Sequence, residues 1–206
     1  MFTVYGAKGS GSVAVEAALT LMGLPYKVVD ADPFGDAAAQ DALEKVSPLR
    51  QVPVLELPDG RTMTESAAIL LWFGDSQQGR PFAPALSDPS RPAYLRWMVY
   101  IPANIYPMYT VKDNVAQWVS DGDCQVELTA NTIDRITACW KIMEAQVSPS
   151  PFILGESPTF LDLYVSVVSR WTPGRDAFAE NCPKLAAVAS RIDEDPRLRK
   201  LWSERF

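Results

Sequence analysis

The spacing of apolar positions changes in a regular order along the first 80 residues. Residues 2–5 alternate like a half-buried strand, and residues 12–22 carry apolar side chains on one helix face. After them we expect a strand over 26–29, a weakly patterned helix over 36–46, strands over 54–57 and 61–63, and a helix over 66–73. The predicted order is β-α-β-α-β-β-α, and its first three elements form a βαβ unit whose parallel crossover should be right-handed.

Strand patterns nearly vanish after residue 80. Residues 80–92 contain four prolines, which is typical of a linker between two patterned regions. Beyond it the pattern predicts helices over 91–109 (bent near Pro102 and Pro107), 126–147, 159–171, 185–192 and 197–202. We therefore expect an α/β domain over residues 1–80, a linker over 81–92 and an all-helical domain over 93–206.

Composition and charge narrow the possible functions. The 206 residues are 48% hydrophobic and 21% charged, which is typical of a folded chain with a substantial core. The net charge of −6 makes nucleic acid and anionic membrane surfaces poor partners, and no apolar run approaches a membrane-spanning length. Three cysteines without a CxxC spacing and no visible signal peptide favour a reducing cytoplasm.

Histidine is absent from the chain, which removes several kinds of catalytic and metal site. No Ser-His or Cys-His nucleophile pair can form, and the usual histidine-based metal centres are excluded. The spacing of the cysteines indicates no zinc ribbon either. We therefore expect no metal site.

The run Gln51-Val52-Pro53-Val54-Leu55 places a proline directly before a buried strand. A trans proline at the first residue of a strand is a common structural feature with no functional meaning. A cis Val52–Pro53 bond is rarer, and it would turn the backbone N–H and C=O of Val52 outward, free to pair with an extended ligand. The residues alone leave both interpretations open.

A second candidate lies in the run Thr64-Glu65-Ser66-Ala67-Ala68-Ile69, just before a predicted helix. Ser66 is a good N-cap residue, so an ordinary helix cap explains it. The free N–H groups and the positive dipole end of the same helix can also hold a ligand carboxylate. With Glu65 beside them to bind an ammonium, the pair would fit the α-amino-acid end of a ligand.

The loop from Tyr5 to Ser12 joins the first strand to the first helix, at the sheet edge where open α/β folds bind ligands. Its glycines allow a ligand to approach the backbone, but the loop does not match a P-loop. Ser12 is the expected N-cap of the helix and Ser10 is expected to be solvated. Alternatively, one of the two hydroxyls donates a hydrogen bond to an anion at the helix N-terminus.

Taken together, these three runs resemble the cytosolic glutathione transferase family, of a bacterial type whose class the residues do not specify. Leu24-Pro25-Tyr26 and the box Gly155…Thr159-Phe160-Leu161-Asp162, which in the family caps a buried helix, extend the resemblance over essentially the whole chain. The resemblance implies a thioredoxin-like α/β N-terminal domain and an all-α C-terminal domain. It also implies a cytoplasmic homodimer with a detoxification role and a substrate pocket between the two domains.

The resemblance also implies roles for individual residues. Pro53 would be cis, and the backbone of Val52 would pair with the cysteinyl part of glutathione. Glu65 and Ser66 would hold its γ-glutamyl end, and Gln51 would add a contact. Glutathione would act as co-substrate, without a metal, and its thiol would attack a small hydrophobic electrophile.

Three hydroxyls are candidates for activating that thiol. The family uses a Tyr, Ser or Cys near the end of the first strand, and this chain offers Tyr5, Ser10 and Ser12 but no Cys there. The glycines beside Ser10 leave room for a sulfur atom, so we favour Ser10 over Ser12. Tyr5 ranks third because it falls within the strand pattern.

The acceptor and the reaction are not specified by any motif. An aromatic-rich stretch is expected near the cleft, although more than half of it should belong to the helical core: Trp97, Tyr100, Ile101, Tyr106 and Tyr109. Two alternatives therefore remain open beside conjugation. One is another glutathione-dependent reaction such as isomerisation, ether cleavage or dehalogenation, and the other is a non-catalytic binding protein of the same fold.

Overall fold

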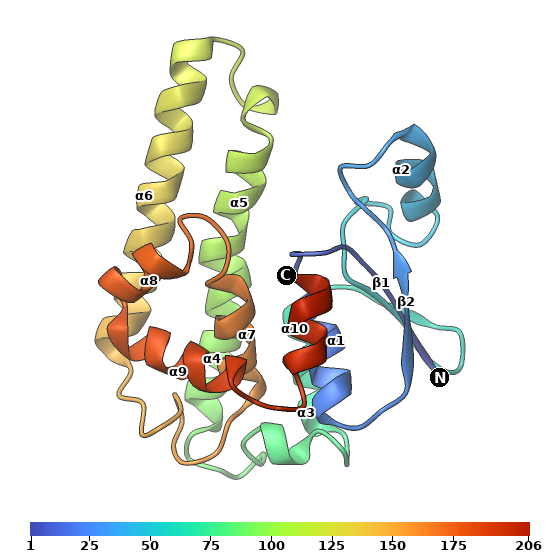
Figure 1. The fold of residues 1–206 in the computed structure, drawn as a ribbon, viewed down its shortest axis with the longest axis vertical. Helices are drawn as coiled ribbons and strands as arrows, with labels where there is room; N and C mark the ends of the chain where they lie inside the picture. The colour runs from blue at the N-terminus through green and yellow to red at the C-terminus, as the bar shows by residue number, and fades with distance from the viewer.

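A computed structural model describes all 206 residues, and its first part has the predicted order of elements (Figure 1). The elements are β1 (Phe2–Gly6), α1 (Ser12–Leu21), β2 (Tyr26–Asp30), α2 (Ala37–Glu44), β3 (Val54–Glu56), β4 (Thr62–Met63) and α3 (Ser66–Asp75). The strands form one sheet in the order β2-β1-β3-β4. β1 is parallel to β2 and antiparallel to β3, and β3 and β4 form a hairpin.

Helix α1 lies in the interior of the molecule. Eight of its residues, Ser12 to Leu19, are buried, because the helix packs against the sheet, α3 and two helices of the C-terminal part, α7 (Phe160–Val168) and α10 (Arg199–Arg205). Its many alanines and valines have small side chains, which let the neighbouring elements approach the helix closely on every side. One charged side chain, Glu16, is nevertheless fully buried on this helix.

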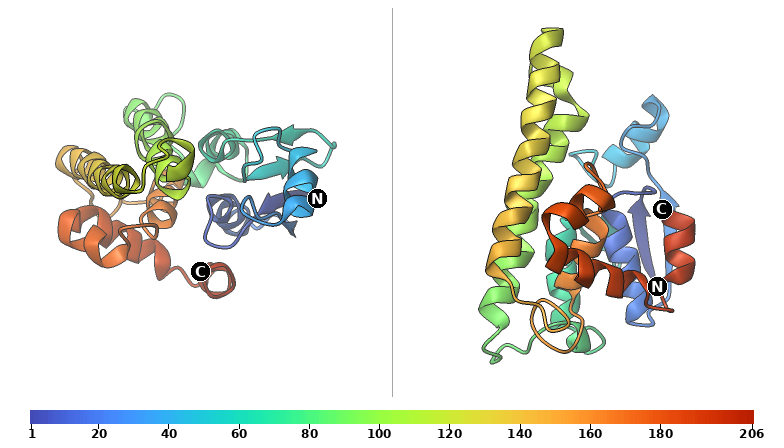
Figure 2. Two further views of the ribbon diagram at one scale, coloured as in Figure 1. Left: turned by 90° about the horizontal axis from the view of Figure 1, so that it is seen from above. Right: turned by 60° about the vertical axis from the view of Figure 1, so that its left-hand side comes forward.

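The remainder of the chain is helical, as the pattern predicts. Its regular elements are η1 (Arg80–Phe82), α4 (Arg91–Tyr100), η2 (Ile101–Ile105), α5 (Tyr106–Asp113), η3 (Val115–Gln117), α6 (Gly122–Gln146), α7, α8 (Arg175–Asn181), α9 (Pro183–Asp193) and α10. The predicted bend near Pro102 is confirmed as a π-helical turn, η2, between α4 and α5. Helices α5 and α6 run side by side as a tall pair (Figure 2).

The predicted cap of α7 is confirmed in detail. Thr159 is the N-cap, and the buried carboxylate of Asp162 accepts hydrogen bonds from the backbone N–H and the hydroxyl of Thr159, each at 2.7 Å. The same carboxylate accepts the N–H of Ile153 at 2.8 Å, which ties the preceding loop to the helix. One hydrophobic cluster of 40 buried residues then joins α7 to α1, α3 and the other helices.

Several boundaries differ from the predictions. Helix α6 begins at Gly122 instead of residue 126, because the Asp121 carboxylate accepts the N–H groups of Asp123 and Cys124 and starts the helix early. The short elements η1, η3 and α8 were not expected, since each is too short to show a period. No helix combines the length and the apolar character that crossing a membrane requires.

The fold is thus a thioredoxin-like sheet with its helices, followed by a mostly helical remainder. Helix α10 is the exception, because it belongs to the helical part of the chain but packs against α1. Figure 1 shows it beside α1, and both views of Figure 2 separate it from α8 and α9. The last helix therefore packs on the sheet-containing part, where it reaches the loop after β1.

Candidate functional site

The three candidate runs meet at one edge of the sheet. Tyr5 pairs with Val54 across β1 and β3, and Leu55 pairs with Met63 across β3 and β4. The loop after β1, the residues before β3 and the N-terminus of α3 therefore lie at the same end of neighbouring strands. This edge brings together the side chains that the sequence singled out.

Pro53 follows a cis peptide bond, which confirms that expectation. Val52 is half-buried and lies outside the strand ladder, and its N–H and C=O take part in no backbone hydrogen bond of the chain. Gln51 is exposed, with its backbone N–H bonded to the Ser47 hydroxyl at 3.2 Å. The backbone of Val52 is thus available to an extended ligand.

Ser66 is not the N-cap of α3, contrary to expectation. Glu65 takes that place with φ of 65°, and its carbonyl accepts the N–H of Ile69, so the helix starts one residue earlier than the Ser pattern suggests. No side chain caps the first turn, and Glu65 is exposed. The uncapped N–H groups of α3 and the carboxylate of Glu65 remain adjacent, as a carboxylate–ammonium ligand requires.

The Ser66 hydroxyl has a partner that the sequence did not indicate. Its oxygen lies 2.9 Å from the hydroxyl oxygen of Tyr164 in α7, and both groups are buried. Burial raises the pKa of Tyr164 to about 12, so its hydroxyl keeps its proton at neutral pH. When Tyr164 donates to Ser66, the Ser66 proton is left to donate to a ligand.

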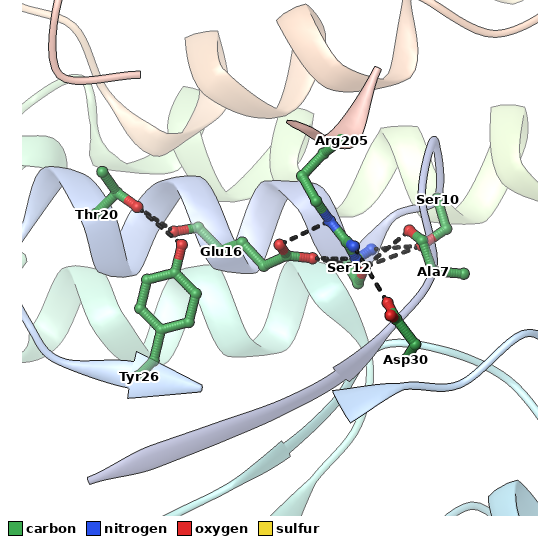
Figure 3. Close-up of polar contacts among 8 residues, drawn as sticks. All are labelled: Ala7, Ser10, Ser12, Glu16, Thr20, Tyr26, Asp30 and Arg205. Carbon is green, nitrogen blue, oxygen red and sulfur yellow. Dashed lines mark hydrogen bonds and ion pairs between the residues drawn. The ribbon is translucent and has the colours of Figure 1, made fainter. Parts of the chain in front are cut away.

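Ser12 is also not a helix cap. Gly11 is the N-cap of α1, and the Ser12 hydroxyl instead lies 3.0 Å from the carboxylate of Glu16 and is fully buried (Figure 3). A carboxylate is a stronger acceptor than a hydroxyl or a carbonyl, so the single Ser12 proton is directed to Glu16. Ser12 therefore has no free proton to give to a ligand.

Ser10 has a different environment although only Gly11 separates it from Ser12. Its oxygen is half-buried and accepts the Ser12 N–H at 3.2 Å. Its own proton faces two neutral acceptors, the Ala7 carbonyl at 2.8 Å and the Ser12 hydroxyl at 3.0 Å. An anion at this place would be a stronger acceptor than either of them.

Tyr5 is already engaged. Its hydroxyl donates to the carboxylate of Glu56 at 3.1 Å, within the sheet. Partial burial, and then the negative charge of Glu56, raise the pKa of Tyr5 above its ordinary value. Both effects oppose a role in stabilising a second anion.

Most of the aromatic stretch belongs to the helical core, as expected. Trp97, Ile101 and Tyr109 are buried in the core cluster. Tyr106 is half-buried and reaches the loop after β1, where a Cβ placed on Gly11 would lie 2.6 Å from its hydroxyl oxygen. Burial raises the pKa of Tyr106 well above its ordinary value.

The interior side of the site contains an ion pair that no sequence pattern revealed. Arg205 in α10 lies 2.9 Å from Glu16, counted from Nε to Oε2, and its Nη2 donates to Glu16 Oε1 at 3.0 Å (Figure 3). Burial raises the pKa of Glu16, while the Arg205 charge and the Ser12 hydroxyl act against that rise. The sequence does show a charged residue, Glu16, within the apolar run of α1. Its partner is 189 positions away, so no local pattern could pair the two.

The chain is similar to known proteins over nearly its full length. A family model described as "Glutathione S-transferase, N-terminal domain" matches residues 12–76. The uncharacterized GST-like protein YncG of Escherichia coli (strain K12) is 33% identical over 202 residues, which cover 98% of this chain and 97% of that protein. The maleylacetoacetate isomerase of Rhizobium meliloti (strain 1021) is 28% identical, over 89% of this chain and 87% of its own.

Solved structures show the same likeness. A glutathione transferase homologue from Sulfitobacter, crystallised with bound glutathione, superposes with a TM-score of 0.86 at 25% identity, covering 99% of this chain and 98% of its own.

Proposed function

Because the chain belongs to the glutathione S-transferase family, we propose that it binds glutathione at this sheet edge and activates the thiol for attack on a small hydrophobic electrophile. The observation that carries the proposal is the meeting of three separate runs at one edge, each with groups that a ligand can engage. They are the unpaired backbone of Val52, the uncapped N-terminus of α3 beside Glu65, and the hydroxyl of Ser10, whose proton now faces only neutral acceptors.

In the proposed complex, glutathione lies extended along the edge. Its cysteinyl N–H and C=O pair with Val52, and Gln51 adds a contact from its exposed position. The γ-glutamyl carboxylate accepts from Ser66 and from the N–H groups of α3, while its ammonium faces Glu65. The thiol then points toward the loop that carries Ser10.

Activation of the thiol is an electrostatic task. A free thiol has a pKa near 8.5, and lowering it by about two units takes roughly 2.7 kcal/mol. A hydrogen bond from the Ser10 hydroxyl and the dipole of α1 both favour the thiolate over the thiol. The thiolate then forms a bond to the electrophilic carbon and displaces its leaving group as an anion. Where there is no leaving group, it adds to an unsaturated carbon, the π bond breaks, and the neighbouring atom takes the electron pair and a proton from water.

A second candidate is a different glutathione-dependent reaction at the same site. The similarity to a maleylacetoacetate isomerase favours isomerisation, in which the thiolate adds to an unsaturated acid and is later eliminated. Both reactions need the same thiolate. Product analysis separates them, because conjugation consumes glutathione whereas isomerisation returns it.

Isothermal titration calorimetry with reduced glutathione tests the proposal. We expect saturable binding at millimolar concentrations or below, and weaker binding by Ser66→Ala. If no heat and no competition appear at millimolar glutathione, the proposed enzyme function is wrong. Binding without turnover of any electrophile would instead favour a non-catalytic member of the fold.

We further propose a homodimer, because the resemblance to the family implies one. Sedimentation at micromolar concentration should give twice the chain mass of 22.7 kDa. A species of single-chain mass would contradict the dimer.

A further inference from the structure

The glycine next to Ser10 is bound by two residues of the C-terminal part. The Gly9 N–H donates to the backbone carbonyl of Arg205 at 2.8 Å, and the Gly9 carbonyl accepts from Trp171 Nε1 at 2.6 Å. We call these two contacts the Gly9 clasp. They join positions 162 or more residues apart and end directly beside the candidate thiol-activating hydroxyl.

The loop needs outside support because of its composition. Gly9 has φ of +67°, and no atom would lie within 4 Å of a Cβ placed on it, so side-chain packing does not hold it. Glycine backbones sample many conformations when free. The Gly9 clasp supplies the constraint that side chains cannot.

The side chain of Arg205 anchors the α10 end of the Gly9 clasp. Besides its ion pair with Glu16 in α1, its Nη1 lies 3.3 Å from the Asp30 carboxylate at the end of β2 (Figure 3). The guanidinium is thus attached on both sides of the loop, to the strand that flanks β1 and to the helix that follows the loop. This attachment fixes where the Arg205 carbonyl meets Gly9.

We propose that Trp171 and Arg205 are positioning residues for thiol activation, which hold Gly9 so that the Ser10 hydroxyl stays at the N-terminus of α1. The inference rests on the proposed function. A hydroxyl must lie within about 3 Å of the sulfur's acceptor position to stabilise a thiolate, and displacements of about 1 Å reduce rates by about 10²-fold in well-organised sites. Neither residue needs to touch glutathione to have this effect.

Trp171→Phe tests the indole half of the Gly9 clasp. The Trp171 ring packs edge-on against Tyr106 and Tyr109, and phenylalanine preserves an aromatic ring there while removing the Nε1 donor. We expect about three- to tenfold less thiolate of bound glutathione at slightly acid pH, the range expected for one lost hydrogen bond. The reduction should appear in kcat, with little change in KM.

Trp202→Phe is the matched control. Trp202 lies on α10 itself and is largely buried, but its Nε1 has no hydrogen-bond partner, so the same substitution removes no contact to the loop. Its thiolate titration should follow the wild type. If Trp202→Phe shifts the titration as much as Trp171→Phe, or if neither shifts it, the proposal is wrong.

Arg205 is tested by a pair of variants. Arg205→Met should reduce the thiolate fraction as Trp171→Phe does, and Arg205→Lys should restore part of it, because an ammonium can still pair with Glu16. If Arg205 had a purely structural role, both variants would have a lower melting temperature, but the thiolate of bound glutathione would titrate alike on the two. Should Arg205→Met not fold, the Trp171→Phe and Trp202→Phe comparison decides alone.

Amide exchange separates a failure of this inference from a failure of the proposed function. Wild-type protein that binds no glutathione would refute the proposed function. In that case the Gly9 amide still reports on the Gly9 clasp, since it should exchange at least tenfold faster in Trp171→Phe than in wild type and Trp202→Phe. Equal exchange in all three proteins would overturn the inference whether or not glutathione binds.

Discussion

At the scale of single residues, the hydroxyl of Ser66 is oriented by one neighbouring side chain. Its only side-chain partner is Tyr164, across the boundary between the sheet and the helices. Because Tyr164 keeps its proton at neutral pH, it can donate to Ser66 and leave the Ser66 proton for a carboxylate. In the proposed complex, the helical part therefore contributes to binding through Tyr164, which bonds to Ser66.

Tyr164→Phe should raise the KM for glutathione about three- to tenfold and change kcat little, as expected for one lost hydrogen bond of about 1 kcal/mol. Steady-state kinetics with varied glutathione measures the effect. Tyr100→Phe is the control, because it also loses a tyrosine hydrogen bond, to the Cys139 carbonyl, but this bond joins α4 to α6 and involves none of the candidate site residues. Equal KM values for the two variants would contradict the role of Tyr164.

The three runs that the sequence singled out meet at one edge of the sheet, but two of their contacts were predicted wrongly. A Ser before a helix usually caps it, yet Ser12 and Ser66 are both first helical residues here, and both bond to side chains. Their partners, Glu16 and Tyr164, lie on the interior faces of α1 and α7. Local preferences cannot indicate such contacts, because they depend on how helices pack.

At the scale of elements, α7 depends on a single buried carboxylate. Asp162 is fully buried and accepts three hydrogen bonds, two from Thr159 and one from Ile153. The sequence predicted this cap correctly, because the Thr-x-x-Asp spacing is a local pattern that does not depend on how the helices pack. It failed for α10, whose short pattern says nothing about the surface on which it packs.

Asp162→Ala should lower the free energy of unfolding by about 3–5 kcal/mol, because it leaves buried donors without an acceptor. Urea unfolding followed by circular dichroism measures this. Asp121→Ala removes the exposed N-cap of α6 and should cost only about 1 kcal/mol. Similar losses in the two variants would contradict the importance of burial at Asp162.

At the scale of the whole molecule, the tyrosines share one property. All seven have a raised pKa, and burial is the largest cause in each case. Several of them join the sheet to the helices, as Tyr164 and Tyr106 do. The single core that links the two parts therefore depends on these groups remaining neutral.

Stability should consequently fall at alkaline pH. A raised folded-state pKa contributes stability that is present below the unfolded pKa of about 10 and is lost as pH rises through the folded value, about 12 for Tyr164. That group alone contributes about 2–3 kcal/mol. Urea unfolding at several pH values, together with tyrosinate absorbance of the native protein, checks this, and tyrosines that all ionise near pH 10 without loss of stability would contradict it.

The pH titration of glutathione's thiolate, read by its ultraviolet absorbance on the wild type, Ser10→Ala and Ser12→Ala, tests the central claim most directly. We predict that bound glutathione ionises about two units below the free thiol on the wild type, and about one unit or more higher on Ser10→Ala. Ser12→Ala should mainly lower stability, because it removes a donor from Glu16, and should leave the titration closer to the wild type. An unchanged titration on Ser10→Ala together with an upward shift on Ser12→Ala would contradict the account and assign the activating hydroxyl to Ser12.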